Sequence, residues 1–146
     1  KGSEDGVSKG SGVVTGQGAV GVIDAVSRNF SYARSFKNHE MNISARLGEE
    51  GAVGPMSWDG LSSDGAILRE IPLHVEFEKG DTVYTSGYSS IFPPDIPLGT
   101  TGEAKIVNGA TYDIEISLFE DFGALRYVTI VENIGEEEIK KLEEGL

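Results

Sequence analysis

The sequence predicts an all-β protein made of two small β-barrel-like subdomains of short antiparallel strands. Two observations support this fold class. Apolar residues alternate with polar residues in several short runs, and turns containing some of the 20 glycines separate these runs along the 146 residues. Alternation with a period of two indicates strands with one buried face. Many short strands joined by frequent turns are typical of small barrels or sandwiches.

The N-terminal part of the chain contains a motif that recurs later. Residues 9–15 read Lys-Gly-x-x-Val-x-Thr, and residues 79–85 repeat this pattern. Each copy precedes further glycines and a strand-like segment, so the repeat indicates two related subdomains; a chance similarity of two glycine-rich turns is the alternative. We therefore expect a first barrel over residues 16–70, and a second barrel over residues 71–133 to which the N-terminal strand in residues 1–15 contributes.

Three runs show the alternation most clearly. Their apolar positions are Met41, Ile43, Ala45 and Leu47; Ile71, Leu73, Val75 and Phe77; and Tyr112, Ile114, Ile116 and Leu118. We expect each run to form a half-buried strand. Asn108-Gly109 lies between residues 105–107 and 111–113 and predicts a hairpin, because this dipeptide suits the positive φ angles of a type I′ turn.

The acidic tail, residues 134–146, departs from the strand pattern. Ile139 and Leu142 are three residues apart, and Glu137 is placed to pair with Lys141. This spacing favours a short surface helix, and a disordered terminus is the alternative.

Composition excludes several classes of function. The net charge is -12 and no Lys/Arg cluster occurs, which opposes binding to nucleic acids and to anionic membranes. Without cysteine, disulfides, thiolate catalysis and cysteine-ligated zinc are excluded. No apolar run is long enough to cross a bilayer, and no signal peptide is recognisable. Because the chain starts at Lys1 and not at a methionine, we expect it to be a processed or cloned fragment that lacks its targeting segment.

Candidate cofactor and metal sites have poor sequence support. Gly16, Gly18 and Gly21 match a dinucleotide-binding spacing, but a short β-branched run follows them instead of a long helix. His39 and His74 belong to no zinc motif. The Asp59-Gly60 and Asp64-Gly65 pairs lack the alternating oxygen ligands of a calcium loop. We expect no cofactor and no metal.

Two further functions are alternatives. A small serine hydrolase would use Ser86, Ser89 or Ser90, but no nucleophile motif surrounds them, so we expect no catalytic residue. A carbohydrate- or peptidoglycan-binding module would use Trp58 and the tyrosines, although a lone tryptophan in an apolar strand is more often a core residue.

The run from Thr85 to Gly99 is the strongest candidate for a binding site. Its three prolines fix the backbone, so the run should form a stiff loop that presents apolar side chains. The alternative is that Ile91 and Phe92 close one end of a barrel as core residues. The candidate partner-binding residues are Tyr88, Ile91, Phe92, Pro93 and Pro94.

Several short motifs together resemble the MreC family of bacterial rod shape-determining proteins. They are Gly80-Asp81-Thr82-Val83-Tyr84-Thr85-Ser86-Gly87, Ile91-Phe92-Pro93-Pro94-x-Ile96-Pro97-x-Gly99, Phe122-x-x-Leu125-Arg126-Tyr127-Val128, Ile43-Ser44-Ala45-Arg46, Gly51-x-x-Gly54 and Trp58-Asp59-Gly60. The resemblance covers the chain from Lys1 to about Asn133, and the combination is specific although no single motif is.

This resemblance implies an extracytoplasmic two-barrel region, anchored in the full protein to the inner membrane by an N-terminal helix that precedes a coiled coil. It implies a non-enzymatic scaffold of the cell-elongation machinery that helps to determine cell shape and to organise and activate peptidoglycan synthases. The implied partners are a transpeptidase penicillin-binding protein, MreD, MreB and a second copy of the chain.

Overall fold

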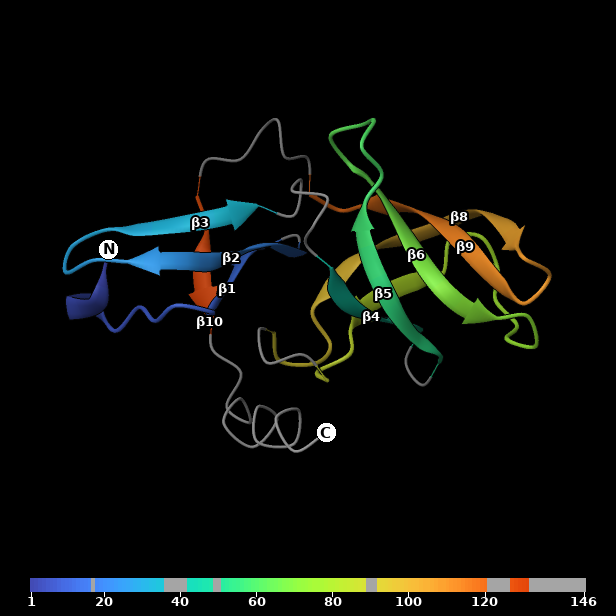
Figure 1. Ribbon diagram of the computed structural model, residues 1–146, viewed down its shortest axis with the longest axis horizontal. Coiled ribbons are helices and arrows are strands. Elements are labelled where there is room, and N and C mark those ends of the chain that lie inside the picture. The colour runs from blue at the N-terminus through green and yellow to red at the C-terminus, as the bar shows by residue number, and fades with distance from the viewer. Residues whose placement is uncertain (17, 36–41, 49–50, 89–91, 121–126, 132–146) are drawn as a thin grey trace.

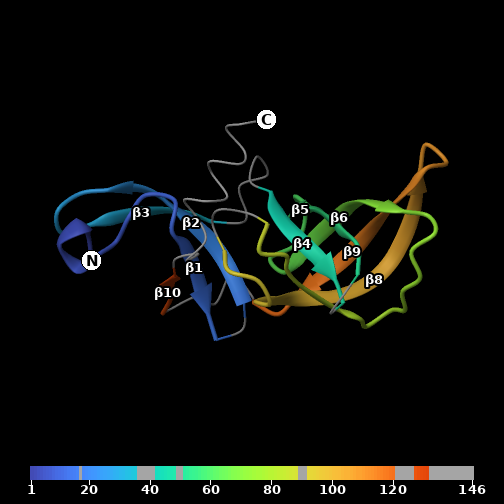
Figure 2. The same ribbon diagram turned by 90° about the horizontal axis from the view of Figure 1, so that it is seen from below.

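The computed structural model is nearly all-β. It describes residues 1–16, 18–35, 42–48, 51–88, 92–120 and 127–131. Within these residues the helical structure is one short 3-10 helix, η1 (Ser3–Asp5). The strands form a four-stranded sheet and a closed barrel, which lie side by side along the long axis (Figure 1, Figure 2). The predicted fold class is confirmed, and the predicted tail, residues 134–146, lies outside the described residues.

The four-stranded sheet is antiparallel and has the order β10-β1-β2-β3. Its strands are β1 (Gly12–Thr15), β2 (Gly18–Val26), β3 (Ser31–Ser35) and β10 (Thr129–Val131). A small core of Val7, Val13, Val20 and Ile23 packs on this sheet.

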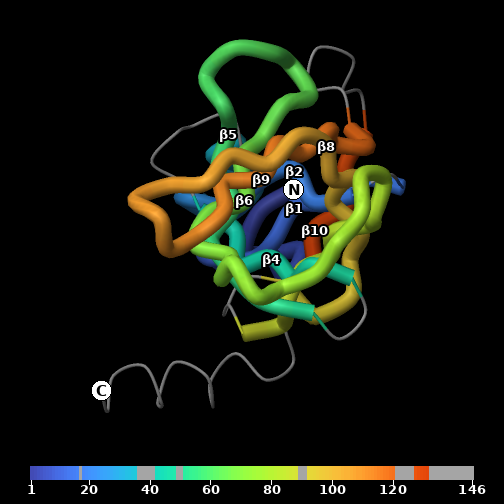
Figure 3. Tube along the Cα trace, turned by 90° about the vertical axis from the view of Figure 1, so that its right-hand side faces the viewer, coloured from blue at the N-terminus to red at the C-terminus, as the bar shows by residue number. Residues whose placement is uncertain are grey.

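The barrel is closed and antiparallel, with the order β4-β5-β6-β9-β8-β7. Its strands are β4 (Ile43–Leu47), β5 (Val53–Trp58), β6 (Gly65–Pro72), β7 (Thr82–Thr85), β8 (Pro97–Val107) and β9 (Thr111–Leu118). Figure 3, which views the molecule from the barrel end, shows these strands around the line of sight with the first sheet behind them. Pairing of β4 with β7 closes the ring.

A continuous hydrophobic core joins the sheet to the barrel. Ala19 of β2 belongs to the same buried cluster as the barrel residues Met56 and Leu68, and Val22 packs against it. The two parts approach closely at Gly18, where an added Cβ would lie 2.5 Å from the carbonyl oxygen of Pro97. The sheet and the barrel are therefore packed together directly.

The repeated motif of the sequence forms the same local structure twice. Gly10 has a φ of 90° and Gly80 a φ of 91°, and each precedes a four-residue strand. The valine of each copy is buried, with exposures of 4% for Val13 and 0% for Val83. Positive φ favours glycine, which explains why both copies carry it at this turn.

Hydrogen bonds around the two turns also correspond. The Gly10 N–H donates to the carbonyl of Ile23 (2.7 Å), and the Gly80 N–H donates to the carbonyl of Thr101 (2.9 Å). In return, Ile23 and Thr101 each donate an N–H to the residue that follows the turn glycine, at 2.8 and 2.9 Å. The β1-β2 and β7-β8 hairpins are thus two copies of one unit.

Strand pairing differs from the expected division into residues 16–70 and residues 1–15 with 71–133. The first strand, β1, pairs with its chain neighbour β2 and with β10, whereas β4, β5 and β6 share one barrel with β7, β8 and β9. The two repeat copies lie in different sheets. The expectation misplaced β1 because a short motif identifies similar hairpins but carries no information on which strands pair across the fold.

The predicted strand over residues 71–77 is wrong beyond its first two residues. Strand β6 ends at Pro72, which has no N–H to extend the ladder. The Val75 N–H instead donates to the carbonyl of Pro72 (3.1 Å), which forms a turn. Val75 and Phe77 still pack against the core, so their apolar spacing reflects burial without strand structure.

The other predicted strands are confirmed. Ile43, Ala45 and Leu47 are buried in β4, and Met41 lies outside the described residues. Strand β9 buries Ile114, Ile116 and Leu118. The hairpin between β8 and β9 has positive φ at both Asn108 (53°) and Gly109 (67°), as the predicted turn requires.

Packing at Gly18 gives a first prediction. Gly18→Ala should lower the free energy of unfolding by about 1–3 kcal/mol, because its Cβ would clash with backbone of β8. Gly16→Ala is the matched control, since a Cβ at Gly16 meets no atom of the described chain within 4 Å. Urea denaturation measures both variants, and equal midpoints would contradict the close packing.

Candidate partner-binding site

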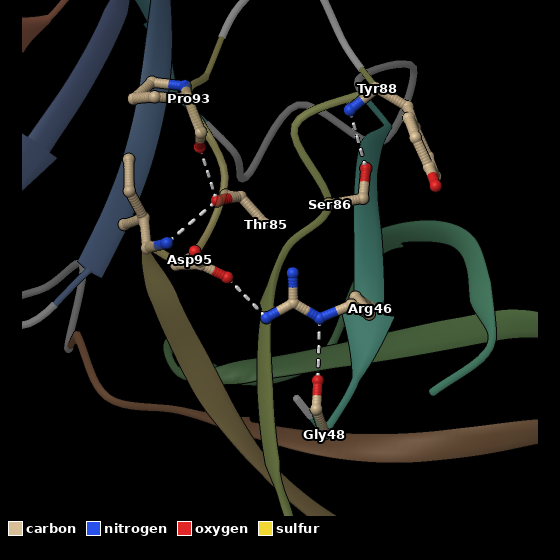
Figure 4. A network of polar contacts seen from close by, with 8 residues as sticks. Arg46, Gly48, Thr85, Ser86, Tyr88, Pro93 and Asp95 are labelled. Carbon is tan, nitrogen blue, oxygen red and sulfur yellow. Dashed lines mark hydrogen bonds and ion pairs between the residues drawn. The ribbon is translucent and has the colours of Figure 1, made fainter. Parts of the chain in front are cut away.

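The candidate binding residues lie in the connection between β7 and β8. We call residues 86–95 the proline loop; Figure 4 shows its polar contacts. Ile91, one of the expected site residues, lies outside the described residues, as do Ser89 and Ser90.

Thr85 holds the two ends of the proline loop together. Its N–H donates to the carbonyl of Ile96 (2.8 Å), and its carbonyl accepts from the Asp95 N–H (3.0 Å). Its Oγ1 donates to the carbonyl of Pro93 (2.7 Å) and accepts from the Ile96 N–H (2.9 Å). Thr85 is 1% exposed, so these four bonds are shielded from water and fix the start and end of the loop.

Ser86 fastens the beginning of the loop to β4. Its N–H donates to the carbonyl of Ser44 (3.0 Å), and its Oγ donates to Ser44 Oγ (2.8 Å). The same Oγ accepts from the Tyr88 N–H (3.1 Å). Ser44 Oγ and the Tyr88 N–H cannot act as a general base, so the Ser86 hydroxyl makes only structural contacts here.

Arg46 of β4 supports the far end of the loop. Its Nη2 donates to Asp95 Oδ1 (2.6 Å), and its Nε donates to the carbonyl of Gly48 (2.8 Å). The guanidinium also lies 5.3 Å from the ring centroid of Tyr84. Asp95 has a φ of 69°, and the bond from Arg46 helps to hold it in this unusual conformation.

The expected site residues fall into two groups. Phe92 is 1% exposed and belongs to the barrel core, as expected of a residue that closes a barrel end. Tyr88 is 72% exposed, Pro94 is exposed and Pro93 is half-buried. Figure 4 shows the Tyr88 side chain extending away from the Thr85 network. The loop therefore buries one aromatic ring and presents another to solvent.

The other sequence motifs have structural roles. Gly18 and Gly21 lie within strand β2, and no helix follows them. Asp59 Oδ1 accepts the N–H groups of Leu61 (2.8 Å) and Ser62 (3.1 Å), which is an Asp-Gly turn. Trp58 packs against the core and donates its Nε1 to the carbonyl of Ser62 (2.7 Å).

In the part of the chain that the structure describes, no three His, Asp or Glu side chains lie close enough together to hold a metal ion. His74 is exposed, and His39 lies outside the described residues. No helix among the described residues is long and apolar enough to cross a membrane.

The supporting roles of two residues are not apparent from the sequence. There, Thr85 is only the first residue of the run, and Arg46 is only part of a short motif. The available signal for Thr85 was its position in register with buried Val83, directly before a proline-rich run. The partnership of Arg46 with Asp95 had no sequence signal, because 49 residues separate them.

Comparison with known proteins identifies relatives of this architecture. A family model described as "Rod shape-determining protein MreC, barrel core" matches residues 1–132. The cell shape-determining protein MreC of Listeria monocytogenes is 28% identical over 142 residues, which cover 93% of this chain and 48% of that protein. The chain thus spans about half the length of this curated relative.

Solved structures share the fold. The structure of MreC from Listeria monocytogenes has a TM-score of 0.84 and 25% identity, over 91% of this chain and 65% of that chain. The MreC chain in a complex between penicillin-binding protein PBP2 and MreC from Helicobacter pylori has a TM-score of 0.69 and 19% identity, over 84% and 77% of the two chains. The latter likeness concerns the fold alone.

The Thr85 network can be tested with an isosteric change. Thr85→Val removes the Oγ1 bonds to Pro93 and Ile96, and should lower the free energy of unfolding by about 1–3 kcal/mol because the Ile96 N–H loses its partner. Thr82→Val on the same strand should change it by less than about 0.5 kcal/mol. Chemical denaturation compares the two, and an unchanged midpoint for Thr85→Val would contradict the network.

Burial of Phe92 gives a separate prediction. Phe92→Ala should cost about 3–5 kcal/mol of unfolding free energy, because it empties a fully buried site. Tyr88→Ala, in the same loop but largely exposed, should leave the thermal melt nearly unchanged. A wild-type melt for Phe92→Ala would show that the ring does not contribute to the core.

Proposed function

Because the chain belongs to the MreC family of rod shape-determining proteins, we propose that it is a non-enzymatic scaffold that helps to determine cell shape by holding peptidoglycan synthases. The main structural support is the proline loop, which is stiffened by Thr85 and presents Tyr88 and Pro94 to solvent. A related MreC from Helicobacter pylori has been solved in complex with PBP2. We assign the same class of partner, a transpeptidase penicillin-binding protein, to this chain.

The loop has the physical properties of a binding surface. Its backbone is fixed at both ends before any partner arrives, so binding would cost little conformational entropy. Tyrosine is enriched among residues that dominate protein interfaces, because it offers a large apolar area with a polar tip. Buried Phe92 would act as the anchor that holds Tyr88 and Pro94 in place, and is not itself a contact in this conformation.

Activation of a synthase follows from differential binding. A scaffold shifts a partner toward its active conformation only when it binds that conformation more tightly than the inactive one. A rigid loop can make this distinction, because it fits one arrangement of the partner surface and does not adapt to the other.

The full-length protein extends this role beyond the present chain. We assign it a location outside the cytoplasm with an anchor in the inner membrane, and contacts with MreD, with MreB and with a second copy of itself. These assignments rest on membership of the family, since the chain spans 48% of the relative from Listeria monocytogenes.

Removal of the Tyr88 ring tests the proposed surface. Tyr88→Ala should raise the Kd for the ectodomain of the cognate transpeptidase by about tenfold or more, because an exposed aromatic contact is lost. Tyr127→Ala is the matched control, since Tyr127 is 86% exposed and precedes β10, a strand of the four-stranded sheet. Biolayer interferometry with both variants measures the effect. An equal Kd for wild type and Tyr88→Ala would refute the loop as the contact surface.

A further inference from the structure

The four-stranded sheet and the barrel differ in charge. Residues 1–40, which contain β1, β2 and β3, have five Lys/Arg and four Asp/Glu residues. Residues 41–118, which contain the whole barrel, have four Lys/Arg and twelve Asp/Glu residues. Two copies of the chain would therefore repel each other less if they met through β1, β2 and β3 than if they met through the barrel.

Strand β3 is at one edge of the sheet, and among the described strands only β2 pairs with it. Two large side chains at this edge are exposed, Phe30 at 76% and Tyr32 at 67%. With Ala25 and Val26 of β2 they line a shallow hollow of about 280 Å³. An edge strand with exposed aromatic residues is a template for pairing with another strand.

The sequence of β3 is complementary to itself. It reads Ser-Tyr-Ala-Arg-Ser over residues 31–35. If two copies pair antiparallel about a two-fold axis at Ala33, each Tyr32 faces the second copy's Arg34, and serine faces serine at the ends. Tyr32 and Arg34 are two residues apart and lie on the same face of the strand, so a guanidinium would meet an aromatic ring at both ends of the pairing.

We propose that β3 is a self-association surface whose partner is the β3 strand of a second copy of this chain, paired antiparallel about Ala33. This inference rests on the proposed self-association and identifies its surface and register. Such a contact is isologous, so it closes as a dimer without leaving the β3 edge open.

The position of β3 keeps the acidic barrels apart. Figure 1 shows β3 running along the long axis of the molecule and pointing toward the barrel. Antiparallel pairing reverses the direction of the second copy, so the two barrels extend to opposite ends of the dimer. The pair Arg34–Asp24 (3.1 Å) holds the arginine near the sheet, with 39% of its side chain still exposed.

A disulfide trap tests the register directly, because the chain contains no cysteine. Antiparallel partners have Cα atoms about 4.5–5.5 Å apart, which a disulfide can bridge. Under mild oxidation Ala33→Cys should form a covalent dimer on a non-reducing gel. Ala104→Cys, exposed on barrel strand β8, is the matched control and should remain monomeric. Equal cross-linking of the two variants would overturn the proposal.

Charge at position 32 provides an independent test by sedimentation equilibrium. Tyr32→Lys places a lysine opposite Arg34 of the second copy at both ends of the pairing. This repulsion should raise the dimer Kd by about tenfold or more. Tyr32→Glu should preserve the dimer, because a carboxylate then faces Arg34. Tyr88→Lys on the proline loop is the control and should match the wild type. A wild-type chain that stays monomeric up to about 1 mM, or a Tyr32→Lys variant that associates like wild type, would overturn the proposal.

Synthase binding distinguishes this inference from the proposed function. Tyr32→Lys should bind the transpeptidase ectodomain as the wild type does. Failure of Ala33→Cys to cross-link while it still binds the synthase overturns only the self-association surface, and failure of the wild type to bind the synthase while Ala33→Cys still cross-links overturns only the scaffold role.

Discussion

Closure of the barrel between β4 and β7 is the interaction on which the rest of the structure depends. Ala45 of β4 lies opposite Thr85 of β7, and Leu47 lies opposite Val83. The pairing is extended at both ends by bonds from the Ser86 N–H to Ser44 (3.0 Å) and from the Gly48 N–H to Thr82 (3.0 Å). Without the β4-β7 pairing, the edges of both strands would be exposed and the barrel core would be open to water.

The pairing of β4 with β7 also positions the ends of the proline loop. Thr85 lies at the end of β7 in the pairing with β4, and it is also the residue that ties the proline loop together. Arg46, next to Ala45 on β4, reaches Asp95 at the other end of the loop. The loop geometry is therefore coupled to barrel closure. The coupling is needed to place Phe92 in the core and Tyr88 on the surface, because the prolines alone fix only local backbone angles.

The two related hairpins belong to different kinds of sheet. In the β7-β8 copy, the hairpin belongs to a closed ring and its connection carries the proline loop. In the β1-β2 copy, the hairpin belongs to a four-stranded sheet in which β3 is an edge strand among the described residues. Closure removes edges, and an open sheet retains them. Among the described strands, those of the barrel therefore have no free edge for pairing, whereas the sheet has one at β3.

Local features of the fold were readable from the sequence, and non-local features were not. The buried alternation of Ile43, Ala45 and Leu47 and the Asn108-Gly109 hairpin follow from side-chain periodicity and backbone φ preferences, which neighbouring residues determine. The family was likewise recognisable from short motifs. Within the candidate site, the sequence identified the proline loop and its residues but left open whether the rings were buried or exposed.

Only the tertiary structure decided which strands pair and where each loop side chain lies. The pairing of β4 with β7, and of β1 with β2 and β10, joins segments whose sequences carry no mark of their partners. Phe92 is buried because the closed barrel provides a core for it, and Tyr88 is exposed next to Ser86, whose Oγ accepts the Tyr88 N–H. Whether a side chain is buried depends on atoms that are distant in the chain. The local sequence therefore indicates that Phe92 and Tyr88 are candidate binding residues, but it does not determine which of them is buried.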